Sequence, residues 1–148
     1  MRRQRRGAAL VELAIAMPLL LLLLLGIIEF GMIMHAQVML DQGAREGART
    51  AALGRLRDEV VAETVRASLP AVPPESVRAE FYSPNSGVWE PIGDTADRKE
   101  NAVPHGAKVR VTIQGYRHRL VTGSFFAWLP GYKDGGFPMA AAMTMRRE

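Results

Sequence analysis

The sequence predicts an α+β protein with one long N-terminal helix, a second short helix, and a small antiparallel sheet of three or four strands. Three observations support this prediction. The run from Leu13 to Ile28 is apolar enough for a membrane helix, an amphipathic stretch follows Gly54, and the hydrophobic period changes to two from Val77 onward. With 148 residues, the chain has room for one membrane segment and one small domain.

The excess positive charge of the chain lies in its first six residues. The formal net charge is +4, from 19 basic and 15 acidic residues, and the arginines at positions 2, 3, 5 and 6 account for all of it. Nucleic-acid binding is therefore not expected, because phosphate recognition needs a basic stripe on the folded part of a protein. The chain has no cysteine, which excludes disulfides, thiolate metal sites and a cysteine nucleophile.

The apolar run predicts a membrane helix. From Leu13 to Met34, Glu29 is the only charged residue, and these residues extend about 33 Å as a helix, enough to cross a hydrocarbon core of about 30 Å. The run is longer than the core of a secretory signal, so we expect the helix to be retained. The arginines before it place the N-terminus in the cytoplasm and the C-terminal domain outside. Glu29 is expected near the outer interface, as an interface anchor or a partner contact.

Glu12 stands at the head of the apolar run, where the positive end of the helix dipole favours a carboxylate. If the chain were cut after Gly7, Glu12 would be the fifth residue of the product. The new amine on Ala8, in the same chain or a neighbour, would then give this acid a partner that it otherwise lacks in a membrane. The residues alone leave a second interpretation open, in which Glu12 is an ordinary interfacial acid.

These residues also carry a family resemblance. Gly7, followed five positions later by Glu12 and then by an apolar helix, resembles the processing site of type IV prepilins and pseudopilins. Residues 19–31 (LLLLLLLGIIEFG) and 43–54 (GAREGARTAALG) are similar to the TadE-like family of tight-adherence (Flp) pilus systems. One departure is Leu13, because processed members of this system often carry an aromatic residue after the glutamate.

The resemblance implies a TadE-like pseudopilin or minor pilin that supports assembly of an adhesive Flp-type pilus and is not an enzyme. Its implied site consists of Gly7 and Ala8 at the cut and Glu12 for peptidase recognition and subunit docking. The implied partners are a prepilin peptidase, other pilus subunits, the inner-membrane assembly platform with its ATPase, and membrane lipid. No cofactor or metal is implied.

The alternative is an uncleaved, single-pass membrane scaffold or binding protein with an extracytoplasmic domain. Under either hypothesis the chain lies in the inner membrane with its N-terminus in the cytoplasm, and a pilin would also enter the surface fibre or stay at its base. The expected divisions are a cationic leader at 1–7, a transmembrane helix and stem at 8–54, and an extracytoplasmic α+β domain at 55–148.

The stem is expected to continue the membrane helix to about Leu53. Gly43, Gly47 and Ala51 recur every four residues, which predicts a helix-packing face on which another helix can approach closely. That helix belongs either to a partner or to the chain's own domain. We favour the domain, because it must pack against some part of the stem.

The domain is predicted from its periodicity and its turn residues. The expected elements are an amphipathic helix at 56–69, strands at 77–82, 107–116 and 137–147, and a short hairpin arm at 88–90. In the clearest strand, the inward-facing residues are Val109, Val111 and Ile113, and the outward-facing ones are Lys108, Arg110, Thr112 and Gln114.

Residues 120–129 (LVTGSFFAWL) are expected to form a short helix that caps the sheet, or a strand that turns back. The aromatic side chains of Phe125, Phe126 and Trp128 are predicted to lie in the core, because so small a domain needs large apolar residues. The alternative is that they contact a partner or the membrane surface.

No catalytic site is predicted. The three histidines, His35, His105 and His118, lack the spacing of a zinc site, and Ser124 does not lie in a nucleophile elbow. Residues 94–98, which include two aspartates, lack the carboxylate density of a strong calcium site. A membrane-anchored enzyme would have to depend on His105, His118 or Ser124.

Overall fold

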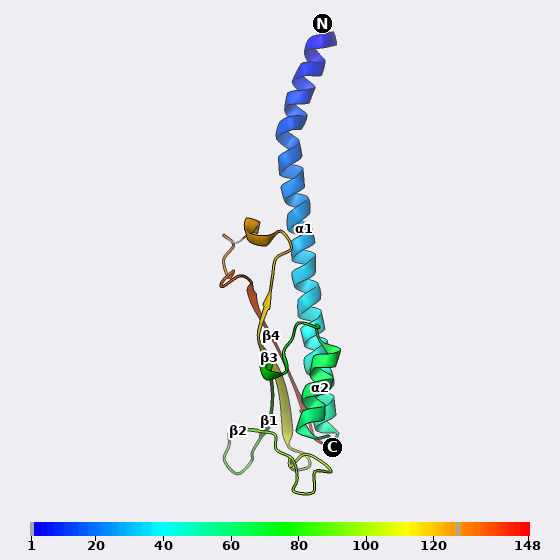
Figure 1. Cartoon of the computed structure of the whole chain (residues 1–148), viewed down its shortest axis with the longest axis vertical. Coiled ribbons are helices and arrows are strands. Elements are labelled where there is room, and N and C mark those ends of the chain that lie inside the picture. The colour runs from blue at the N-terminus through cyan, green and yellow to red at the C-terminus, as the bar shows by residue number, and fades with distance from the viewer. Residues whose placement is uncertain (1, 127) are drawn as a thin grey trace.

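The computed structural model describes residues 2–126 and 128–148. Its dominant element is α1 (Arg2–Ala52), a helix of 51 residues that continues unbroken past Pro18. The first half of α1 projects away from the rest of the chain, and the second half forms one side of a small domain (Figure 1). Among these residues, side chains are described from Gly7 onward except those of Ser124 and Phe126, so those of the leader arginines lie outside the described part.

The domain contains one further α-helix and a four-stranded sheet, as predicted. The elements in chain order are α2 (Arg57–Ala67), a 3₁₀ turn η1 (Pro74–Ser76), β1 (Val77–Tyr82), β2 (Trp89–Pro91), β3 (Lys108–His118), a 3₁₀ turn η2 (Gly123–Phe126) and β4 (Phe137–Arg146). The strands pair antiparallel in the order β2-β1-β3-β4. The α+β class is therefore confirmed.

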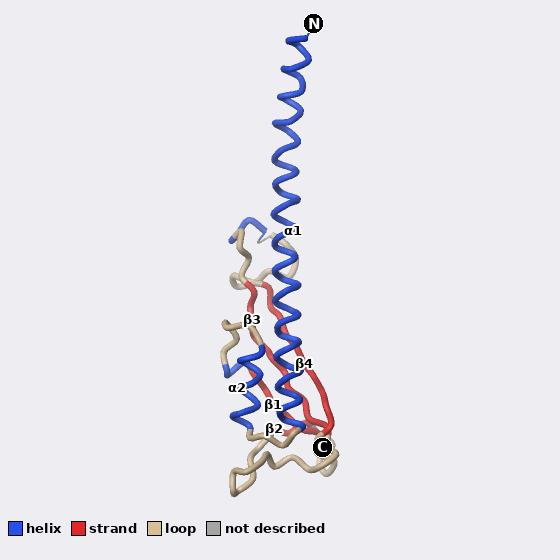
Figure 2. Tube along the Cα trace, turned by 90° about the vertical axis from the view of Figure 1, so that its right-hand side faces the viewer, coloured by secondary structure: helices blue, strands red, loops and turns tan. Residues whose placement is uncertain are grey.

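The sheet and the two helices form two layers around one core (Figure 2). Small side chains on α1, such as Ala44 and Ala48, are buried against the sheet, and Val60 of α2 is fully buried beside them. From β3, the inward side chains are Val109, Val111 and Ile113, each with no exposed surface, as the alternation predicted.

Two details of β3 differ from the prediction. Thr112 was expected to face water but is 9% exposed, because its central strand places it between Arg78 of β1 and Ala142 of β4. The strand also runs two residues further, to His118, through a bulge between Ile113 and Tyr116 that contains Gly115 at φ +79°. The extra residue reverses the alternation, so His118 is buried.

The C-terminal end of α1 is closed by groups from distant parts of the chain. The buried side chain of Asn101 donates through Nδ2 to the carbonyl oxygens of Ala51 (2.9 Å) and Arg55 (3.0 Å). Its Oδ1 accepts from the buried guanidinium of Arg147 at 2.9 Å. Because the last carbonyls of a helix have no partner within it, this cluster stabilises the point where the stem ends.

Candidate functional site

The first half of α1 presents an apolar surface without a protein covering. The large apolar side chains from Leu10 to Ile28 are exposed, and this stretch extends about 28 Å. Within the described residues, α1 is the one helix long and apolar enough to cross a membrane. The first buried side chain among those described is Glu29, which marks where the domain begins to cover the helix.

Gly7, Ala8 and Glu12 lie at the N-terminal end of this apolar surface, in the first turns of α1. All three are exposed, and no atom outside the helix lies within 4 Å of where a Gly7 Cβ would be. Ala8 and Glu12 are four residues apart, so they share one face of the helix. Among the described side chains, none forms a hydrogen bond or ion pair with Glu12. The site is therefore accessible, and its acid is open to a partner from outside the domain.

A comparison with known protein families identifies this segment. Residues 7–49 match the model of the family described as TadE-like protein. Over these residues the chain is TadE-like. The match begins at Gly7 and ends inside the stem, so it contains Glu12 and the apolar helix but not the sheet. No curated protein and no solved structure matches the chain.

The small-residue face of the TadE-like helix packs against the chain's own α2. A Cβ at Gly43 would lie 2.6 Å from Ser68 Cβ and 2.9 Å from the Thr64 carbonyl oxygen. At Gly47 a Cβ would overlap the Thr64 hydroxyl, and Ala51 is fully buried. The chain's own domain therefore covers this face in the structure, which is the alternative that we favoured from the sequence.

Glu29 has a role that the sequence did not indicate. Its carboxylate is 4% exposed and accepts hydrogen bonds from the backbone N–H of Val121 (3.2 Å) and of Thr122 (2.5 Å), and from the Thr122 hydroxyl (2.6 Å). The sequence left it as an interface anchor or a partner contact, and in the structure its hydrogen-bond partners belong to the chain's own loop. A loop more than ninety residues away in sequence is instead attached to the middle of α1.

The prediction that the aromatic side chains of this loop lie in the core is wrong for Phe125 and Trp128. Phe125 is 55% exposed and Trp128 is 76% exposed, whereas the side chains of Phe126 and Ser124 lie outside the described part. The segment forms the short turn η2 and loops, not a helix capping the sheet or a strand. Its attachment to Glu29 holds it beside α1 and away from the sheet (Figure 1).

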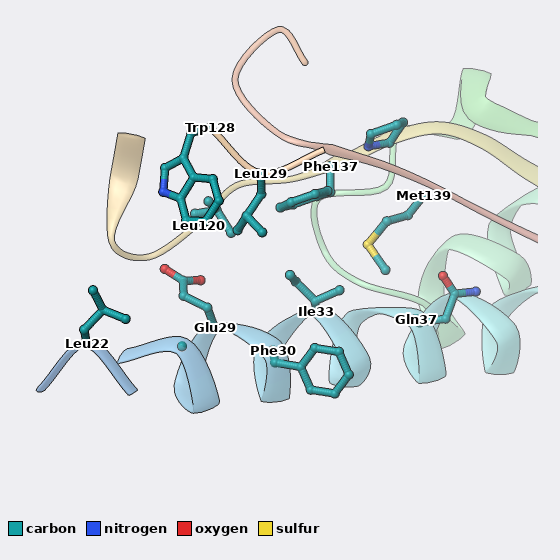
Figure 3. Close-up of a pocket in the computed structure, with 12 residues that line it drawn as sticks. Leu22, Glu29, Phe30, Ile33, Gln37, Leu120, Trp128, Leu129, Phe137 and Met139 are labelled. Atoms are coloured by element: carbon teal, nitrogen blue, oxygen red, sulfur yellow. The ribbon is translucent and has the colours of Figure 1, made fainter. Parts of the chain in front are cut away.

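A groove lies between this loop and α1 (Figure 3). Its volume is about 690 Å³, and its lining is almost wholly apolar, with Leu22 and Phe30 from α1, Trp128 and Leu129 from the loop, and Phe137 from the start of β4. Figure 3 shows the Glu29 carboxylate pointing from α1 toward the loop. The sequence does contain a signal for this groove, the uncharged stretch 120–132. It was missed because the apolar residues of that stretch were expected to lie in the core.

The residues considered for catalysis are dispersed. His105 Nδ1 lies 2.5 Å from the backbone oxygen of Glu148, and His118 is buried at the end of β3 with no hydrogen-bond partner in the structure for its Nε2. His35 is exposed on α1. In the described part of the chain, no group of three or more His, Cys, Asp or Glu side chains could hold a metal ion.

The acidic turn at 94–98 has structural contacts instead of an open ligand set. Asp94 Oδ1 accepts the backbone N–H of Arg57 at 2.8 Å and so caps the start of α2, while Arg98 pairs with Asp58 at 3.5 Å. The hydroxyl of Thr95 and the backbone N–H of Lys99 hold the pKa of Asp97 below its ordinary value. These contacts fix the loop that meets the junction of α1 and α2.

Proposed function

We propose that this protein is a pseudopilin or minor pilin of a tight-adherence (Flp-type) pilus system, a non-enzymatic subunit that supports assembly of the pilus. The observation that carries the proposal is the TadE-like match over residues 7–49, which begins at the glycine of the glycine–acid spacing. The exposed apolar half of α1 is consistent with a subunit that lies in the inner membrane before assembly.

The proposed processing step is hydrolysis of the Gly7–Ala8 peptide bond by a prepilin peptidase. The step removes the cationic leader and creates an amine at Ala8, one helical turn from Glu12. An ionised acid in a membrane helix requires a partner where water does not reach it: its cost is about 2.5–3.5 kcal/mol at the helix centre and smaller at the head of the apolar run, where Glu12 lies. The amine of the same chain or of a neighbouring subunit meets that requirement.

The proposed topology places the leader in the cytoplasm and the domain outside, in accordance with the arginines that precede α1. The peptidase, the assembly platform with its ATPase, and other pilus subunits are the proposed partners. They would approach the exposed half of α1, because the stem's small-residue face is already occupied by α2.

The discriminating experiment is complementation of a strain that lacks the gene. Glu12→Ala is expected to abolish pilus assembly with the protein still present in the membrane, whereas Glu59→Ala, an exposed change on α2, is expected to assemble normally. Pilus number is counted by electron microscopy, and membrane levels are measured by immunoblot. Normal assembly with Glu12→Ala would favour the alternative, an uncleaved membrane scaffold or binding protein.

A further inference from the structure

The loop from 120 to 132, here called the aromatic loop, has the composition of a membrane-inserted segment. It contains no charged residue, and a cationic residue stands immediately at each end, Arg119 before it and Lys133 after it. Both cations are exposed. At its tip, Trp128 is 76% exposed, an unusual exposure for so large an apolar side chain in a domain of this size.

The position of the aromatic loop is set by α1. On the helix side, the groove that it forms is lined by four apolar residues and by two polar ones: Leu22, Gly26, Phe30 and Ile33, with Glu29 and Gln37. Leu22 lies six residues before Ile28, the end of the uncharged run, so the loop reaches about 9 Å along the apolar part of the helix. Amphipathic elements at a membrane surface bury their apolar faces to a depth of about 5–10 Å.

In such a position, the hydrogen bonds of Glu29 satisfy polar groups that would otherwise be unpaired away from water. Away from water, an unpaired carboxylate and the unpaired N–H groups of a loop both cost several kcal/mol. Here each satisfies the other, because the Glu29 carboxylate accepts from the N–H groups of Val121 and Thr122 and from the Thr122 hydroxyl. The attachment therefore suits a site that water does not reach, although Phe125 and Trp128 of the loop are exposed on the domain.

We propose that the aromatic loop lies in the bilayer leaflet on the domain's side, and that acyl chains of that leaflet fill the groove between the loop and α1. The lipid is chosen over other occupants because the groove is continuous with the exposed apolar surface of α1, from Leu19 to Ile28. Charge supports the same occupant. Arg119 and Lys133 lie where cations contact phospholipid headgroups, and tryptophan is enriched at this depth.

The inference rests on the proposed membrane span of α1 and adds a second point of attachment. With two attachments, the domain cannot rotate or tilt freely about the helix. Its orientation on the membrane is fixed before any assembly step, and extraction of the subunit requires the aromatic loop to leave the bilayer as well as the helix.

The chain offers its own spectroscopic test, since it contains two tryptophans. Trp128 is in the aromatic loop, whereas Trp89 lies on β2, against Tyr82 and Arg110, toward the opposite end of the domain (Figure 1). The Trp89→Phe variant reports Trp128 alone, and Trp128→Phe reports Trp89 alone. Each full-length variant is reconstituted into phosphatidylcholine–phosphatidylglycerol vesicles with or without bromine on the acyl chains.

Brominated lipid is expected to remove most of the Trp128 emission and to leave the Trp89 emission unchanged. A third variant, with Leu20→Trp in a chain that lacks both native tryptophans, reports the helix itself. If that reporter is quenched and Trp128 is not, α1 spans the membrane and the inference about the aromatic loop is wrong. If neither is quenched, the membrane span fails as well, and with it the proposed function.

A second copy of the chain is the other occupant that the experiment tests. In that case Trp128 is shielded both from brominated lipid and from aqueous acrylamide, and the shielding disappears as lipid dilutes the protein. That result would overturn the proposal. In the Trp128→Phe variant, the emission of Trp89 confirms that the domain is folded in the same vesicles, because its contacts with Tyr82 and Arg110 exist in the folded sheet. Circular dichroism makes the same check on the two variants that lack Trp89.

Discussion

The close approach of α1 and α2 makes Gly47→Ala a quantitative test of the stem. Alanine is favoured over glycine within a helix by about 1 kcal/mol, so the change stabilises α1 if nothing else responds. A steric overlap with neighbouring residues works against this gain in helix stability. A Cβ at Gly47 would overlap the Thr64 hydroxyl and would lie 3.1 Å from both Thr64 Cβ and Val111 Cγ1.

Overpacking of this kind costs about 1–3 kcal/mol, and the overlap with a buried, hydrogen-bonded hydroxyl places this case in the upper part of that range. After subtraction of the helix gain, we expect Gly47→Ala to lower the free energy of unfolding by about 1–2 kcal/mol. For a domain of this size that corresponds to a melting temperature lower by about 4–16 °C.

The assay is thermal unfolding of the full chain in detergent, followed through near-ultraviolet circular dichroism. The matched control is Gly31→Ala on the same helix, where no atom outside the helix lies within 4 Å of the added Cβ and no loss is expected. Adding Thr64→Ala to Gly47→Ala removes the overlapping hydroxyl and should restore a substantial part of the loss. If Gly47→Ala behaves like Gly31→Ala, or Thr64→Ala restores nothing, the contact between the two helices is not as described.

Two further predictions concern the polar contacts. Asn101→Ala removes the shared partner of the Ala51 carbonyl at the end of α1, the Arg55 carbonyl just after it, and the Arg147 guanidinium, so we expect a loss of about 2–4 kcal/mol in chemical denaturation. Asn85→Ala at an exposed turn is the near-neutral control, and an equal effect of the two changes would contradict the capping role. Glu29→Ala removes the hydrogen bonds that attach the aromatic loop to α1. Tryptic cleavage after Arg119 should therefore become faster in detergent, while the melting temperature of the sheet changes little. An unchanged cleavage rate would show that Glu29 does not hold the loop.

The sequence predicted the features that depend on local pattern. The apolar run, the break at Gly54 and the alternation of Val109, Val111 and Ile113 each depend on neighbours a few residues away, and the structure contains the corresponding elements. Gly54 has φ +80°, which explains why the helix ends where it does.

What the sequence did not predict depends on contacts between distant residues. The bond from Thr122 to Glu29 joins residues 93 apart, and no local pattern indicates it. The same attachment explains the error about Trp128, because hydrophobicity shows that a side chain avoids water but not whether protein or lipid covers it. The buried position of His118 depends on a bulge at Gly115, which changes the face of each residue that follows.

At the candidate processing site, the sequence indicates which residues matter but does not show their reaction. The spacing of Gly7, Ala8 and Glu12 was evident from the sequence, and the structure adds that all three are exposed on one apolar helix. Their chemistry nevertheless depends on molecules outside the chain, a peptidase and neighbouring subunits. It is tested by observing the product of the reaction.

The most direct test of the central claim is the intact mass of the membrane-extracted protein, produced with and without its prepilin peptidase. If the Gly7–Ala8 bond is processed, the chain begins at Ala8 only when the peptidase is present, with Glu12 as its fifth residue. A chain that still begins at Met1 in the presence of the peptidase would contradict the processing step and favour the uncleaved scaffold. A chain that begins after about residue 36 would show that the apolar run is a signal peptide and not a retained membrane helix.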